Sequence, residues 1–367
     1  MKILDDFKKK LKFIERSINS SRTPEEFLMR GGAYPEIERV QQFLAKYPIS
    51  QIIKAQMYNR KEDLYYHDGY FGFVLKLHIE SKIEAQLQHL LKFGFPESSY
   101  LNFILDNVSQ DGTTLMSLVT KEHKNKTKNK NNQHILISIR KKIIELFKQN
   151  DLAADVARPD NLLHYYNQRL NGKADEHYDP QQYIFAQIKP WITPEIDSNG
   201  VLTIAGDKCI VFYTRQYPNV RVDPFIAGRF QNPIASIMQD FIDVGIEMYY
   251  SLSVDLANKL KPTKDKNQEN IPEKQYVFNT TIIVKFNEFN SQNQSQAEFT
   301  QEIIEYFRYK HDWYIFQNYS SSFQKFMNSL PLQYDQDVTA LSNESSINQI
   351  YPLSKIAELL PIGVRHE

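Results

Sequence analysis

The residue types that bind phosphates, hold metals or attack substrates occur in this sequence, but their spacing builds no complete catalytic motif. A phosphate-binding P-loop needs GxxxxGK[ST], in which backbone amides wrap the phosphates while the lysine and hydroxyl reach terminal oxygens and magnesium. Only Gly172 is followed by lysine; the residue after that lysine is Ala174, and Asn167 occupies the first glycine position. The dinucleotide fingerprint GxGxxG is also absent. We therefore expect no nucleotide site on a glycine-rich loop.

Metal ligation is also poorly supported by the spacing of donor residues. The nine histidines are scattered from His67 to His366, and no two stand four residues apart, as helical zinc ligands do. Asp335 and Asp337 form a DxD pair that could hold a divalent cation through oxygen ligands. They follow Pro331 just before an expected helix, however, and helix capping is the favoured interpretation.

Hydrolytic and nucleolytic chemistry each lack a required partner. Pro159-Asp160 could be half of a nuclease signature, whose other half is an acidic-x-lysine motif on a strand that follows closely. Asp207-Lys208 lacks the middle residue of that motif. The DxK that begins at Asp6 comes before Pro159-Asp160 and is expected on a helix. No GxSxG elbow occurs. The single cysteine, Cys209, lies in an apolar strand pattern, which favours a buried and unreactive thiol. We predict no catalytic, cofactor-binding or metal-binding residues and no cofactor; an enzyme site assembled from scattered residues is the least favoured alternative.

Composition limits the class of protein. The 367 residues suggest two or three lobes, and 44 basic residues balance 44 acidic ones, so overall charge does not favour nucleic acid or anionic lipid. One cysteine excludes an intramolecular disulfide and indicates a reducing, cytoplasmic setting. No apolar stretch of ~18 residues and no signal-peptide core are present.

The first 120 residues predict an α/β lobe with an amphipathic leading helix. Residues 3–18 place apolar side chains at helical spacing and lysines on the other face, which suits docking on protein or, alternatively, contact with an anionic membrane. After a second helix at Pro35–Lys46, the Asp68-Gly69 turn predicts a hairpin. A capping box then starts a helix that ends at Gly94, and a strand follows at Tyr100–Asn107.

Residues 121–200 read as a basic loop and helical connector. The run KEHKNKTKNKNN at Lys121–Asn132 is rich in lysine and asparagine, and we expect an exposed loop there. Its lysines could contact phosphates, although solvated lysines are the more common outcome. Helices are expected at His134–Gln149 and near Asn161–Leu170.

Residues 201–332 predict a βαββαβ lobe, and residues 333–367 a C-terminal helical segment. In the lobe, Ile246–Asp255 alternates apolar and polar residues, as a strand with one buried face requires. The fold class expected is α+β, with a ferredoxin-like split βαβ sheet at about 201–332 and the N-terminal hairpin-helix-strand lobe beside it. The pattern predicts strands at 208–215, 246–255, 275–286 and 312–317, and helices at 233–243, 296–308, 323–330 and 353–360.

Several ordered stretches resemble the amino-terminal half of the TraC family, the large assembly ATPases of conjugative type IV secretion systems. They are Gly72-Phe73-Val74-Leu75 after the hairpin, SYLNFIL, VFYTRQYP, FQKFMNSLPL and a final LLP, which together span roughly Gln51 to Pro361. Each stretch is short, so the resemblance rests on their order and spacing. Arg215 and Tyr217 also match the family pattern, but a local role at a strand end is the more common one for such an arginine.

The resemblance implies a non-catalytic docking module. In the family this half places a RecA-like motor against inner-membrane channel components, and the chain here ends where that motor would begin. It implies protein contacts with type IV secretion components, self-association of the full-length protein, and a cytoplasmic position peripheral to the bacterial inner membrane, with possible lipid contact through residues 3–18. The segment from Tyr217 to Phe230 is expected to offer contact surface.

A protein that binds or processes nucleic acid is the alternative from a different class. It would use the basic residues of Lys121–Lys142, and its binding would weaken steeply as salt rises.

Overall fold

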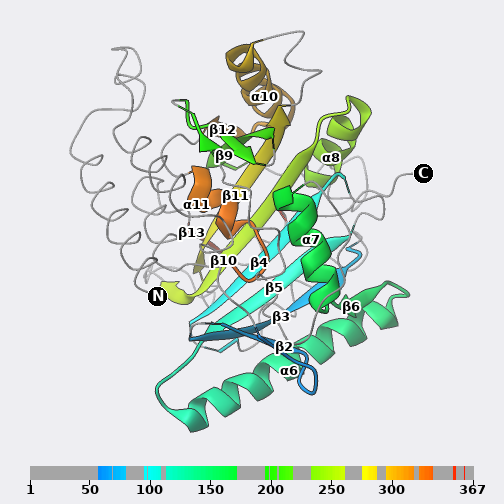
Figure 1. Ribbon diagram of the computed structural model, residues 1–367, viewed down its shortest axis with the longest axis vertical. Coiled ribbons are helices and arrows are strands. Elements are labelled where there is room, and N and C mark those ends of the chain that lie inside the picture. Colours follow the sequence, from blue (N-terminus) through cyan, green and yellow to red (C-terminus); the bar gives the residue numbers. More distant parts are fainter. Residues whose placement is uncertain are drawn as a thin grey trace, which may run out of the picture.

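The described part of the molecule is an α+β structure built on one large antiparallel sheet (Figure 1). The computed structural model describes residues 57–79, 95–108, 113–171, 195–217, 233–260, 275–286, 295–317, 322–333, 350–352 and 359, apart from 68, 97, 198 and 205. Its strands are β1 (Met57–Asn59), β2 (Leu64–His67), β3 (Tyr70–Leu77), β4 (Ser99–Asp106), β5 (Thr114–Lys121), β6 (Ala154–Val156), β7 (Glu195–Ile196), β8 (Leu202–Ile204), β9 (Asp207–Gln216), β10 (Met248–Leu260), β11 (Gln275–Phe286), β12 (Tyr314–Gln317) and β13 (Ile350–Pro352). Its described helices are α6 (Lys126–Gln149), α7 (Pro159–Asn171), α8 (Pro233–Asp243), α10 (Gln296–His311) and α11 (Ser322–Asn328).

The sheet contains two four-stranded units with the same strand order. In the first unit the strands lie in the order β6-β3-β5-β4, and in the second in the order β12-β9-β11-β10. Numbered along the chain within each unit, both orders read fourth, first, third, second. A helix joins the third and fourth strands of each unit, α6 in the first and α10 in the second, and α7 and α11 follow the fourth strands.

The two units meet through their equivalent strands β4 and β10. These strands pair antiparallel, so that Tyr100 lies opposite Asp255 and Tyr249 lies opposite Asp106. The second residue of each strand is therefore a tyrosine that lies opposite an aspartate of the other strand. This reciprocity gives the sheet an approximate two-fold axis between β4 and β10.

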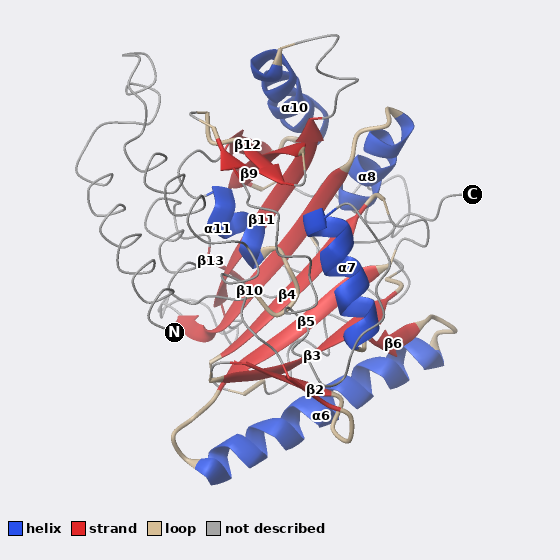
Figure 2. Ribbon diagram, in the orientation of Figure 1, coloured by secondary structure: helices blue, strands red, loops and turns tan. Residues whose placement is uncertain are grey.

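Helices cover both faces of this sheet (Figure 2). On one face α6, α8 and α10 contribute buried residues to an apolar core that includes Phe73, Phe212 and Tyr250. On the other face α7 and α11 contribute to a second core that includes Val74 and Val211. The central strands are consequently buried on both sides.

Burial on both sides corrects the expectation for Ile246–Asp255. The alternation predicts one solvent-facing side, but Ser251, Ser253 and Asp255 are all buried. The two serines donate hydrogen bonds to the side-chain oxygen of Asn102 on β4, at 2.7 and 3.1 Å. Their polar groups are satisfied across the joint between the units, which is why polar alternation here does not indicate exposure.

The basic run is also different from the expected loop. Lys121 ends β5, and α6 begins at Lys126, so most of Lys121–Asn132 is helical. The side chain of Asn125 caps the helix by accepting hydrogen bonds from the backbone amides of Thr127 and Lys128. An asparagine N-cap of this kind marks the start of a helix, although the lysine-rich composition that follows it is typical of a loop.

Several expected elements are confirmed. The hairpin pairs β2 with β3 around Gly69, whose φ of +78° suits glycine in a tight turn. The strands and helices expected from 208 to 317 occur within a few residues of their expected bounds, as do α7 and α11. The helices expected at 3–18, 35–46, 81–94 and 353–360 lie outside the described residues, except for residue 359, and so does the DxD of Asp335 and Asp337.

The first unit is larger than the expected hairpin-helix-strand lobe. β6 pairs with β3 over Leu75–Leu77, while β2 pairs with the start of the same strand. Residues 154–156, expected in a connector, therefore extend the N-terminal part of the sheet.

Candidate functional site

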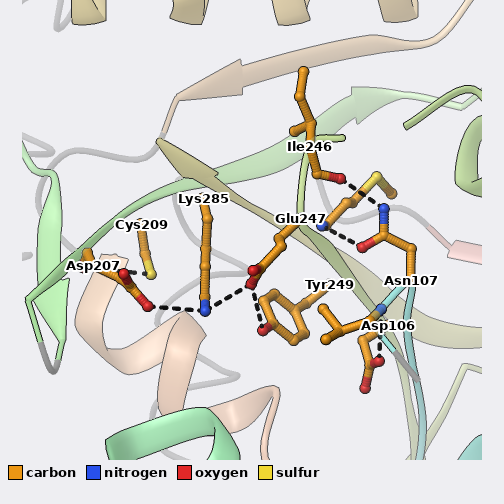
Figure 3. A network of polar contacts seen from close by, with 10 residues as sticks. Asp106, Asn107, Asp207, Cys209, Ile246, Glu247, Tyr249 and Lys285 are labelled. Atoms are coloured by element: carbon orange, nitrogen blue, oxygen red, sulfur yellow. Dashed lines mark hydrogen bonds and ion pairs between the residues drawn. The ribbon is translucent and has the colours of Figure 1, made fainter. Parts of the chain in front are cut away.

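A group of charged and aromatic side chains lies on the α7 face of the sheet, near the joint of the two units (Figure 3). Lys285 on β11 makes two ion pairs, at 3.0 Å to Asp207 and 2.7 Å to Glu247. Burial alone would lower the pKa of Lys285, but Tyr249, Glu247 and Asp207 outweigh it and hold that pKa above its usual value. Lys285 therefore stays protonated and links β11 to Asp207 of β9 and to Glu247, the residue before β10.

Tyr249 on β10 carries a stacked arginine. The guanidinium carbon of Arg169 lies 3.3 Å from the centre of the Tyr249 ring, and its distance to the Phe326 ring is 5.5 Å. Arg169 is 6% exposed, and its Nε and Nη2 have no hydrogen-bond partner among the described residues. Burial raises the pKa of Tyr249 to about 12, so its hydroxyl stays neutral at physiological pH. This is a strong cation–π contact between α7 and the second unit.

Cys209 is buried, as its strand pattern predicts. Burial raises the pKa of its thiol to about 11. The reactive thiolate is therefore nearly absent at neutral pH, which suits a structural residue.

A cavity of about 470 Å³ opens beside this group, between α7 and the first unit of the sheet. Its polar lining includes Lys76 of β3, Asp106 of β4 and Tyr165 of α7. Tyr165 is 8% exposed, and its hydroxyl has no hydrogen-bond partner among the described residues. Most of the lining residues are polar, with Ile104, Leu115, Ala157 and Leu162 as the apolar ones, so the lining is more polar than that of a typical small-molecule site.

The other distinctive surface is the outer face of α6. Lys124, just before the helix, and Lys126, Lys130, Lys141, Lys142 and Lys148 along it are exposed. The inner face is anchored by Arg140, whose Nη1 donates to the backbone oxygens of Glu62 and Asp63 at 2.6 and 2.7 Å. The helix lies at the edge of the first unit (Figure 1) and carries these exposed lysines there.

The two residues that match the family pattern lie in different surroundings. Tyr217 is buried against Phe278 and Trp313, and its hydroxyl accepts a hydrogen bond from the backbone amide of Thr280 at 3.1 Å. It therefore belongs to the core, and the expectation of a contact surface beginning at Tyr217 is wrong for that residue; 218–230 lie outside the described residues. Arg215 is exposed, with its guanidinium carbon 5.6 Å from the Phe316 ring.

Sequence reasoning missed the cavity residues and Arg169. Lys76, Asp106 and Tyr165 are 30 or more residues apart in the sequence and belong to no motif. One signal was present: the stretches Tyr100–Asp106 and Tyr249–Asp255 share a tyrosine, a polar third residue and a final aspartate. Aligning them would have indicated a repeat. Within the described ranges, no group of three or more histidine, cysteine, aspartate or glutamate residues is placed to hold a metal ion.

Comparison with known proteins assigns no family to this arrangement. No family model matches the chain, and no curated protein is significantly similar to it in sequence. Among the helices described, none is both long and apolar enough to cross a membrane.

Proposed function

We propose that this chain is a non-catalytic assembly module of a type IV secretion apparatus, acting through protein contacts at the cytoplasmic face of the bacterial inner membrane. One observation carries the proposal. The stretches that resemble the TraC family fall at matching places in the two units, with Gly72–Leu75 in β3 and VFYTRQ in β9, the first strand of each unit. SYLNFIL forms most of β4 at the joint between the units, and FQKFMN lies in α11.

The proposal extends to the fold. The order fourth, first, third, second, with every neighbouring pair antiparallel, is the arrangement of a ferredoxin-like split βαβ unit. We assign that arrangement to residues 207–317 and, going beyond the sequence expectation, to residues 70–156. Two such units in one sheet make a broad platform with exposed helices at its edges, which suits docking between larger components.

The test is a binding measurement with purified inner-membrane components of a conjugative secretion system. The full chain should associate with at least one of them and should hydrolyse no ATP. The absence of association with every component, measured with folded protein, would contradict the docking role. An ATPase activity that a single acidic-to-alanine change abolishes would contradict the non-catalytic part.

A second function is favoured by one specific observation, the lysine row on α6. A helix with several exposed lysines holds their ammonium groups at fixed spacing, which favours contacts with successive phosphates more than an irregular loop does. In this alternative the chain binds nucleic acid through Lys124–Lys142, without base-specific contacts.

Salt dependence distinguishes this alternative from protein docking. Binding of a DNA duplex should weaken steeply between low and physiological salt, and replacing Lys124, Lys126, Lys128 and Lys130 by glutamine should abolish it. The control changes Lys141, Lys142 and Lys148 at the other end of the helix. Equal losses in both variants would indicate attraction by charge along the whole helix, and unchanged binding in the first would exclude the patch.

A further inference from the structure

The outer face of α6 is strongly basic. The helix carries seven basic residues and one acidic residue, and five of the basic ones are exposed. Because an α-helix turns by about 100° per residue, four of these lysines lie within about 60° of one another around the helix axis. They are Lys126, Lys130, Lys141 and Lys148. A row of positive charge about 33 Å long therefore follows this edge of the first unit.

The equivalent helix of the second unit, α10, has an acidic outer face. Three exposed glutamates lie within about 60° of one another around it, namely Glu298, Glu302 and Glu305. The helix packs beside α8, since the Tyr306 hydroxyl donates to Asp240 of that helix. Together α8 and α10 carry five acidic and two basic residues, and Lys310 is already paired with Asp240. The two surfaces are thus of opposite charge.

Both surfaces also expose large apolar side chains. Among the residues that the structure describes, four such side chains are exposed, and three of them belong to these surfaces. Ile135 lies on α6, Val244 directly follows α8, and Tyr309 on α10 is 76% exposed. By helical spacing Tyr309 falls within the same sector of α10 as the three glutamates. An exposed tyrosine among charged residues is typical of a protein interface.

The basic and acidic surfaces lie at opposite ends of the molecule (Figure 1). α6 lies at the lower end of the longest axis, and α8 and α10 lie at the upper end. The two surfaces are therefore too far apart to meet within one chain, but each is open to another copy. A contact between two different surfaces of the same chain continues from copy to copy, and it closes into a ring or extends as a filament.

We propose that the chain associates head to tail with further copies of itself, the α6 surface of one copy docking on the α8–α10 surface of the next. Opposite charges and exposed apolar side chains on both surfaces support a second copy as the occupant. A nucleic acid would match the lysines but would leave the acidic surface without a role. This inference goes beyond the proposed function and does not depend on it, because failure to bind secretion components would leave it intact.

The size of the surfaces predicts a weak contact. α10 has 16 residues and is about 24 Å long, and with α8 beside it the surface is about 20 Å wide. An interface of about 1,000 Å² in total is at the low end for specific complexes. Because charge supplies much of the attraction, association should weaken as salt rises.

The experiment is sedimentation velocity of the full chain over a range of concentrations, at about 50 mM and about 500 mM salt. At low salt we expect association with a dissociation constant on the order of tens of micromolar. At high salt it should be about tenfold weaker or worse. A wild-type protein that stays monomeric at low salt and high concentration would overturn the proposal.

Charge reversal tests the two surfaces separately and then together. Lys130→Glu with Lys141→Glu on α6, or Glu302→Lys with Glu305→Lys on α10, should each weaken association by about tenfold or more, because like charges then face each other. An equal mixture of the two variants, or all four changes in one chain, restores opposite charges and should recover association. Glu298 is retained because it belongs to the capping box of α10.

Recovery distinguishes a contact from misfolding, because a variant that fails to fold would not be rescued by its counterpart. Failure of both the mixture and the fourfold variant to recover association, with each protein folded by circular dichroism, would overturn the proposal. So would loss of duplex DNA binding in the α6 variant with unchanged self-association, since the lysine row would then be a nucleic-acid surface.

Matched controls change similar residues outside both surfaces. Arg60→Glu with Arg158→Glu reverses two exposed basic residues and should leave association unchanged. Tyr309→Ala should weaken association severalfold, whereas Met57→Ala, at the fourth exposed apolar side chain, should not. Equal effects of the two apolar changes, or of the two basic pairs, would contradict the assigned surfaces.

Discussion

The two units of the sheet share a strand order but differ in what they place on the α7 and α11 face. In the first unit the row Lys76-Leu115-Ile104 leads to Asp106. In the second unit Asn279 pairs with Ser253. The register of β9 with β11, continued by two residues, places Arg215 beside Asn279. The matching row is therefore Arg215-Asn279-Ser253, and it leads to Asp255. A basic residue and an aspartate thus occupy equivalent positions in the two units, while the two residues between them are apolar in the first unit and polar in the second.

The equivalent rows of the two units lie in different surroundings. The polar row of the second unit lies in a region held together by polar side chains, among them Ser253 and Asn102 at the joint. The apolar row of the first unit forms the floor of a cavity. The first unit therefore differs from the second in lining a cavity with this row and in carrying α6 along its edge.

The largest effect is expected where the two units differ in backbone contact. Gly72 pairs with Val119 in the first unit, and Val211, paired with Ile283, holds the matching place in the second. A Cβ atom on Gly72 would lie 2.2 Å from the backbone oxygen of Leu118. Making the first unit like the second by Gly72→Val should therefore lower the free energy of unfolding by about 3 kcal/mol, measured by urea denaturation. A variant as stable as the wild type would show that β3 and β5 are not so close.

A smaller loss is expected where α6 is attached to the sheet. α10 is attached through Phe299, Ile303 and Phe307, whereas α6 also uses the buried Arg140. Arg140→Met keeps the apolar stem but removes the hydrogen bonds to Glu62 and Asp63, which should cost about 2 kcal/mol. Lys141→Met, at the exposed neighbouring position, should change stability by less than about 0.5 kcal/mol. Equal effects of the two changes would contradict the anchoring role.

Much of the fold could be predicted from the sequence because many elements carry local signals. The Asp-Gly turn predicts the β2–β3 hairpin, and the alternation of Ile246–Asp255 predicts most of β10. β5 was not predicted because it is buried throughout until Lys121, so its residues do not alternate. β6 has only three residues and is defined by its pairing with β3.

The candidate site could not be predicted because it is made by long-range packing. No residue close to Lys76 in the sequence indicates that α7 packs over it, and Tyr165 belongs to no recognisable sequence motif. For the same reason the serines of β10 indicated exposure when read alone. Their acceptor, Asn102, is about 150 residues earlier in the chain.

The second unit contains a pH-sensitive contact with an effect on the order of 1 kcal/mol. Nε2 of His311 is 3.0 Å from the hydroxyl of Tyr306, which donates to Asp240, and Lys310 pairs with the same carboxylate. Burial, aided by Lys310, lowers the pKa of His311 from 6.5 to about 4. Below pH 6.5 the unfolded chain binds a proton that the folded one does not, so stability should fall from pH 6.5 to 4.

Partial exposure of this histidine limits the loss to about 1 kcal/mol. The measurement is the free energy of unfolding against pH for the wild type and for His311→Gln. The difference between the two proteins should change over that window and be constant above it. A constant difference throughout would show that His311 titrates normally in the folded protein.

The smallest effect concerns Cys209, whose thiol should react slowly with an alkylating reagent in the folded protein. Because burial raises its pKa to about 11, iodoacetamide at pH 8 should label it about a hundredfold more slowly in the folded than in the unfolded protein. Mass spectrometry over time gives both rates. Rapid labelling of the folded protein would contradict a buried thiol.

The most direct test of the two-unit arrangement is a disulfide across its joint. Ile104 on β4 lies opposite Ser251 on β10, in neighbouring strands whose residues are about 150 apart in the sequence. In a Cys209→Ala background, Ile104→Cys and Ser251→Cys should form an intramolecular disulfide on oxidation, because directly opposed residues in antiparallel strands are within bridging distance. Peptide mapping should find positions 104 and 251 linked in a monomer. Free thiols at both positions in the folded, oxidised protein would contradict the pairing of β4 with β10, and with it the joint between the two units.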